Sequence, residues 1–125
     1  MINPLKEIIP IYREMLEKGD NLALIDLYYD EEIQQVENEE LPVKGKAAIR
    51  EIEIANIEGV NSFEQHFTTL VIDEEKGIVM GEMEIVFDSK KYGLKRLNEA
   101  VVQHWKNGKM VYQKFYYKSF VNVNG

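Results

Sequence analysis

The stretch VVQHWKNGKMVYQKFYY, residues 101–117, decides the fold of this chain. Apolar and polar residues alternate on both sides of Asn107-Gly108, a dipeptide that favours the left-handed backbone of a tight hairpin turn. We therefore expect two long antiparallel strands here. His104, one of two histidines in the chain, lies in the first strand beside the single tryptophan. The face on which it falls decides whether it can reach a functional site.

The length of the turn sets which residues share a face. A two-residue turn places Gln103 on the face of Tyr112, whereas a three-residue loop with a glycine bulge places it on the face of Val111. We favour the second, because it separates a mostly apolar face from one rich in lysine and tyrosine, as a pocket and an exterior require. The inner face is then Val101, Gln103, Trp105, Val111, Gln113, Phe115 and Tyr117, and the outer face is Val102, His104, Tyr112, Lys114, Tyr116 and Lys118.

Neither histidine is expected to be catalytic. His104 lies on the outer face, and His66 is turned outward because Phe63 and Phe67 read as the inward residues of its strand. Two isolated histidines and the lack of cysteine predict no metal site, and no cofactor is expected.

Outward from the hairpin, the chain reads as helices followed by strands. Helical spacing appears in residues 3–20, in a segment that opens at Asp20, and between Gly45 and Gly59, with Pro10 expected to kink or split the first helix. Strand patterns cover residues 31–37, 62–73, 77–88, 97–106 and 109–120. Helices first and an antiparallel meander afterwards predict a single α+β domain over residues 1–125.

Composition excludes several partner classes. The chain has 15 Lys+Arg against 22 Asp+Glu and a net charge of −7, which repels nucleic acid and anionic membrane surfaces. It contains neither the apolar core of a signal peptide nor an apolar run of membrane length. We expect a cytoplasmic protein with no nucleic-acid and no membrane partner.

The central stretch LYYDEEIQQVENEELPVKGKAAIREIE, residues 27–53, and the hairpin HWKNGKMVYQKFYY resemble the nuclear transport factor 2-like superfamily, and its SnoaL-like group most closely. The resemblance covers nearly the whole chain. It implies that the three N-terminal helices pack in the concave face of a strongly curved, cone-shaped antiparallel sheet around an apolar pocket. The superfamily includes isomerases, polyketide cyclases, dehydratases and non-catalytic binding modules, so the resemblance implies a fold and not one activity.

Ketosteroid isomerase, within this superfamily, uses a carboxylate base with a tyrosine and a protonated aspartate. Aligned with that pattern, the tyrosine falls on Tyr12, the base on Val36 and the aspartate on Gln103. The proton acceptor is therefore missing at its usual place. Glu37 could replace it if the strand slipped by one residue, and Glu99 is a second substitute, although it is expected to be solvated near the start of its strand.

The expected pocket has neutral polar groups in an apolar wall. Two inward glutamines are costly to bury without partners, which points to a wet or ligand-filled cavity. Tyr12 and Gln103 are expected to reach a single ligand oxygen. The predicted lining is Tyr12, Gln34, Phe67, Met83, Gln103, Trp105, Gln113, Phe115 and Tyr117.

Three functions remain open. The first is a pocket for a small, largely neutral ligand; the second is an isomerase or cyclase-like enzyme that uses Glu37 or Glu99; the third is a non-catalytic dimeric interaction module. Ala100, Val102, Tyr112 and Tyr116 make the outer face more apolar than a solvated face needs, so a homodimer through the sheet is expected.

Overall fold

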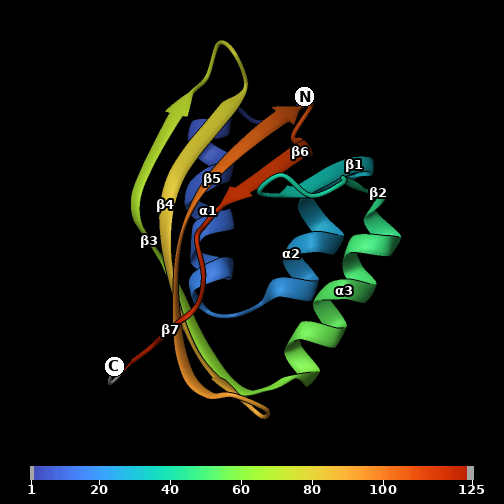
Figure 1. The fold of residues 1–125 in the computed structure, drawn as a ribbon. Coiled ribbons are helices and arrows are strands. Elements are labelled where there is room, and N and C mark those ends of the chain that lie inside the picture. The colour runs from blue at the N-terminus through green and yellow to red at the C-terminus, as the bar shows by residue number, and fades with distance from the viewer. Residues whose placement is uncertain (1, 124–125) are drawn as a thin grey trace.

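The computed structural model describes residues 2–123 and contains helices packed inside a curled sheet (Figure 1). The elements follow one another as α1 (Leu5–Glu17), α2 (Asn21–Tyr28), β1 (Tyr29–Glu37), β2 (Val43–Lys44), α3 (Lys46–Glu58), β3 (Val60–Asp73), β4 (Ile78–Ser89), β5 (Gly93–Lys106), β6 (Lys109–Tyr116) and β7 (Val121–Asn122). The predicted α+β architecture is confirmed.

The sheet has the strand order β2-β1-β6-β5-β4-β3, and β7 pairs with β5 beside the end of β6. The four long strands, β3 to β6, are antiparallel to one another, as predicted. β1, however, runs parallel to β6, so the sheet is mixed. It curls around α1 without closing, while α2 and α3 stand on the same concave side (Figure 1).

The first helix is continuous over Leu5–Glu17 despite Pro10, which lies on its exposed side. Pro4 occupies the N-cap position of α1, and it makes no side-chain cap hydrogen bond. Instead, the carboxylate of Glu74, from the turn after β3, accepts the backbone N–H groups of Leu5 and Lys6, each at 2.9 Å. These bonds hold the pKa of Glu74 below its usual range, as expected for an anion at a helix N-terminus.

The hairpin between β5 and β6 has a shorter turn than expected, but Gln103 and Gln113 lie on the same face of the sheet, as expected. Lys106 pairs with Lys109 across a two-residue turn, in which Asn107 and Gly108 have φ values of 53° and 75°. A bulge follows at once, because Trp105 pairs with Met110 while His104 pairs with Tyr112.

The extra residue, Val111, restores the pairing of Gln103 with Gln113. The turn length was therefore predicted wrongly, and Met110 rather than Val111 enters the core, where none of its surface is exposed.

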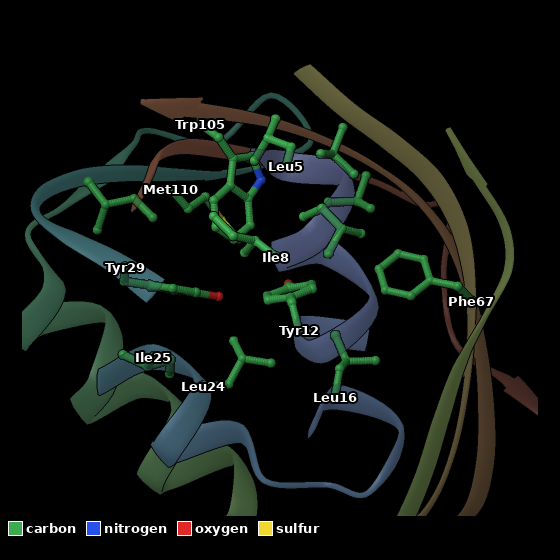
Figure 2. Close-up of a cluster of buried hydrophobic side chains, with 14 of the residues drawn as sticks. Leu5, Ile8, Tyr12, Leu16, Leu24, Ile25, Tyr29, Phe67, Trp105 and Met110 are labelled. Atoms are coloured by element: carbon green, nitrogen blue, oxygen red, sulfur yellow. The ribbon is translucent and has the colours of Figure 1, made fainter. Parts of the chain in front are cut away.

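The core joins the inner side of α1 to the sheet. Figure 2 shows Ile8, Tyr12 and Leu16 of α1 among side chains from α2 and from the β5–β6 hairpin. Each such apolar side chain stabilises the fold by about 1.5–3 kcal/mol through burial. Within residues 2–123, no helix is long and apolar enough to cross a membrane.

Candidate functional site

A cavity of about 540 Å³ lies between the helices and the inner face of the sheet. Its volume is within the range of small-molecule sites. The walls are mostly apolar and come from all three helices, from β1 and from β3 to β6; they include Leu24, Ile25, Ile49, Met83, Leu97 and Phe115. Tyr117 and Phe120, which follow β6, complete the lining.

The structure brings most of the predicted site residues to this cavity. The predicted residues that line it are Tyr12, Glu37, Met83, Glu99, Gln113, Phe115 and Tyr117. Three others, Phe67, Gln103 and Trp105, are buried in the core outside the lining. This corrects the expectation that Gln103 and Trp105 form part of the pocket wall.

Gln34 is exposed on β1, and its neighbour Gln35 lines the cavity instead. The pairing of β1 with β6 shifts register between Tyr29 and Gln34, and Gln35 then lies opposite Gln113. Ile33 is fully buried, so counting in twos from it would have placed Gln35 and Glu37 inward.

Gln103 is held in one orientation by the indole of Trp105. The indole N–H can only donate, and it donates to Oε1 of Gln103 at 3.0 Å. The amide nitrogen of Gln103 therefore faces the other way, where it donates to the hydroxyl of Tyr12 at 3.0 Å and to Oε1 of Gln113 at 2.8 Å. Both amide hydrogens and the carbonyl oxygen of Gln103 are therefore engaged by other side chains of the protein.

The orientation of Gln103 in turn fixes the orientation of the Gln113 amide. Because its Oε1 accepts from Gln103, its amide nitrogen donates to the hydroxyl of Tyr29 at 2.9 Å and to Oε1 of Gln35 at 3.1 Å. We call Trp105, Gln103 and Gln113 the amide chain.

Both phenols at the ends of the amide chain accept a hydrogen bond, so each can direct its own hydrogen elsewhere. Figure 2 shows the hydroxyl end of Tyr29, from β1, directed toward Tyr12 of α1. Burial raises the pKa of Tyr12 and of Tyr29 well above the ordinary value, which keeps both hydroxyls protonated. They are neutral donors that line the cavity.

A second polar group lies apart from the amide chain and consists of Glu99, Glu37 and Tyr117, the carboxyl cluster. Only 9% of Glu99 is exposed, so the expectation that it is solvated is wrong. The reason is that β5 begins at Gly93, and Glu99 therefore lies in the middle of the strand. Burial, and then the charge of Glu37, raise the pKa of Glu99 to about 7.

Tyr117 ties the end of β1 to the segment after β6. Its hydroxyl donates to Oε2 of Glu37, and its backbone N–H donates to Oδ1 of Asn38 at 2.9 Å. The bond to Glu37 raises the pKa of Tyr117. Glu37 lines the cavity, and the register of β1 against β6 shifts before it, between Tyr29 and Gln34.

Both histidines are exposed, as predicted, and the ring of His104 packs edge-on against Tyr112 with centroids 5.1 Å apart. Their lack of a catalytic role stays a prediction. Among residues 2–123, no three His, Cys, Asp or Glu side chains are grouped so that they could hold a metal ion.

No protein-family model and no curated protein sequence matches the chain. Solved structures do. A candidate SnoaL-like polyketide cyclase from Mesorhizobium loti superposes with a TM-score of 0.77 at 23% identity, covering 92% of this chain and 100% of that one.

Two structures with lower sequence identity have the same fold. A nuclear transport factor 2-like protein of unknown function from Exiguobacterium sp. 255-15 gives a TM-score of 0.72 at 14% identity, covering 90% of this chain and 98% of that one. An epoxide hydrolase from M. tuberculosis gives 0.70 at 12% identity, with 90% and 80% covered. At these identities the likeness concerns the fold.

Proposed function

Because the chain has the nuclear transport factor 2-like fold of the SnoaL-like structures, we propose that it binds a small, largely apolar molecule in its cavity. One observation carries the proposal: a cavity of about 540 Å³ has mostly apolar walls and a few convergent polar groups. Tyr12 and Tyr29 suit a carbonyl or hydroxyl oxygen on that molecule, since both can donate.

The neutrality expected of the ligand rested on the inward glutamines. Gln103 and Gln113 satisfy one another, so they do not determine the charge of a ligand.

Filling the cavity tests the proposal. Met83 lines it, whereas Met80, on the same strand, faces outward and is exposed. Met83→Trp is expected to abolish uptake of a neutral fluorescent probe, N-phenyl-1-naphthylamine, and Met80→Trp to leave it unchanged. Equal uptake by the two variants would place binding elsewhere, and no uptake by the unmodified protein would count against a ligand pocket.

A second candidate function is proton transfer on the bound molecule. The observation that favours it is Glu99, a buried carboxyl group with a pKa of about 7 beside Glu37, since a group of that pKa can take and return a proton at neutral pH. Under this proposal Glu99→Gln abolishes hydrogen–deuterium exchange next to the carbonyl of a bound ketone. Exchange that persists in the variant excludes Glu99 as the base.

We also propose that the chain forms a homodimer through the outer face of the sheet. Support comes from the partly exposed apolar side chains of Met80, Val102, Tyr112 and Tyr116 on that face. Sedimentation at micromolar concentration tests it, and a single species of 14.6 kDa is the contrary result.

A further inference from the structure

The charged side chains that line the cavity are all acidic. They are Glu37 from β1, Glu53 from α3 and Glu99 from β5, and no Lys, Arg or His is among the lining residues within the described part of the chain. A carboxylate or phosphate ligand would therefore meet repulsion without a compensating partner.

Glu99 lacks the partners that a buried carboxyl group normally has. It is more than nine-tenths buried and lines the cavity. Within residues 2–123, no hydrogen bond or ion pair holds its carboxyl oxygens, and its environment consists of burial and the like charge of Glu37. Its carboxyl oxygens keep accessible surface and Glu99 lines the cavity, so a partner from outside the chain can reach them.

The other two acidic groups are held in place by neutral donors. Glu37 accepts the hydroxyl of Tyr117, and Glu53 accepts the side-chain amide of Asn21 at 3.0 Å. Neither is neutralised by a cation within the cavity, since Tyr117 and Asn21 are uncharged. Met83, opposite Glu99 on β4, contributes no titratable group.

The walls of the cavity contain aromatic rings. Phe63, Phe87, Phe115 and Phe120 line the cavity with Tyr117, and the ring of Tyr117 stacks on that of Phe120 with centroids 6.5 Å apart. Aromatic faces attract organic cations while also burying apolar surface.

We propose that the cavity binds an organic cation, a protonated amine on an apolar body, with its ammonium group against Glu99 and Glu37. The inference rests on the proposed function and assigns the charge of the ligand. An ammonium group supplies the hydrogen-bond donors and the positive charge that Glu99 lacks, and the net charge of −7 attracts such ligands over longer distances.

Three probes of matched shape test the charge: 4-phenylbutylamine, 4-phenylbutan-1-ol and 4-phenylbutanoate, each titrated by calorimetry. At pH 8 the amine is expected to bind about tenfold tighter than the alcohol, and the carboxylate weakest. The pKa of Glu99 lies near 7, and the ammonium group binds more tightly when Glu99 is ionised. The affinity for the amine should therefore rise about tenfold from pH 6 to pH 8, as Glu99 loses its proton. The alcohol should not show this rise.

Glu99→Gln removes the charge at nearly constant shape. It is expected to lower the amine affinity at pH 8 to about that of the alcohol, to remove the rise with pH, and to leave alcohol binding nearly unchanged. Glu82→Gln is the matched control, because Glu82 is exposed on the neighbouring strand and does not line the cavity. It should bind all three probes as the unmodified protein does.

The two proposals can fail separately. If the alcohol binds as tightly as the amine, or if Glu99→Gln keeps the amine preference, the cation inference is overturned while the pocket stands. If the three probes fail to bind but N-phenyl-1-naphthylamine is still excluded by Met83→Trp alone, the cation inference again falls. If neither the probes nor the fluorophore bind, the proposed function itself is refuted.

Discussion

The amide chain and the carboxyl cluster are both buried polar groups, but they differ in whether their hydrogen bonds are complete. In the amide chain, the indole of Trp105 sets the direction of two amides, and each amide group finds a partner. In the carboxyl cluster, Glu99 is 9% exposed, and no hydrogen bond or ion pair from the described residues 2–123 holds its carboxyl oxygens. Burial of a polar residue alone therefore does not identify a ligand site; an unmet hydrogen-bonding requirement does.

Gln103→Leu should have the largest effect, because it breaks the completed amide chain. It leaves the N–H of Trp105 and the Oε1 of Gln113 without partners in the core, at a cost of about 3 kcal/mol in the free energy of unfolding. Urea denaturation measures this cost. Gln34→Leu, at an exposed position, is the control and should change stability by less than about 0.5 kcal/mol. Similar stability of the two variants would mean that the chain of hydrogen bonds contributes little.

Glu99→Gln should raise the free energy of unfolding relative to the unmodified protein, whereas Gln103→Leu lowers it, and the gain should depend on pH. The pKa of Glu99 is raised in the folded protein from 4.5 to about 7, so the folded state binds this proton more tightly than the unfolded state does. The contribution of Glu99 to stability is complete below about pH 4.5 and is lost as pH rises through 7.

The variant lacks this loss, so its stability relative to the unmodified protein should increase by about 2 kcal/mol from pH 5 to pH 8. Urea denaturation at the two pH values measures the difference. A constant difference would show that Glu99 titrates normally.

Tyr29→Phe should have a smaller effect, because it removes one acceptor at the end of the amide chain. The amide of Gln113 keeps its bond to Gln35, so the expected loss is about 1 kcal/mol in unfolding free energy. Tyr28→Phe is the control on the adjacent, half-buried ring. A loss as large as that of Gln103→Leu would show that Gln113 cannot hold its position without the phenol.

His104→Ala should have the smallest effect, since His104 belongs to neither polar group. It is exposed and packs on Tyr112, so ligand binding should be unchanged and stability should fall by less than about 0.5 kcal/mol. A change confined to the sedimentation profile would place His104 at the proposed dimer interface. Loss of ligand binding would show that a residue outside both groups controls the cavity.

The sequence predicts the sheet and its parity well, because both depend on local alternation. Gln103 and Gln113 were placed on one face correctly, although the turn is shorter than expected and a bulge at Val111 compensates. A glycine bulge inside a three-residue loop and a bulge just after a two-residue turn give the same alternation farther along the strands, so the sequence did not distinguish them.

Residues at the cavity were harder to predict, because their burial depends on distant partners. Glu99 was expected to be solvated, and it is buried because β5 starts at Gly93, which places Glu99 in the middle of the strand. Gln103 was expected to meet a ligand, and only the donor-only indole two residues away reveals that its hydrogen bonds are already used. Gln34 was predicted to line the cavity in place of Gln35. The choice depends on the register shift in β1, which arises from its pairing with β6 and cannot be seen in the sequence of β1 alone.

The parallel pairing of β1 with β6 has a consequence for synthesis on the ribosome. The bond between Gln113 and Gln35 joins residues 78 positions apart, so β1 leaves the ribosome long before its partner strand exists. Until then the long edge of β1 that will receive β6 stays unpaired, a state in which chaperones and aggregation compete with folding. Contacts of such long range also slow folding. The cavity, whose polar groups come from both ends of the chain, is therefore among the last features to form, and a nascent chain cannot use a ligand to guide its early folding.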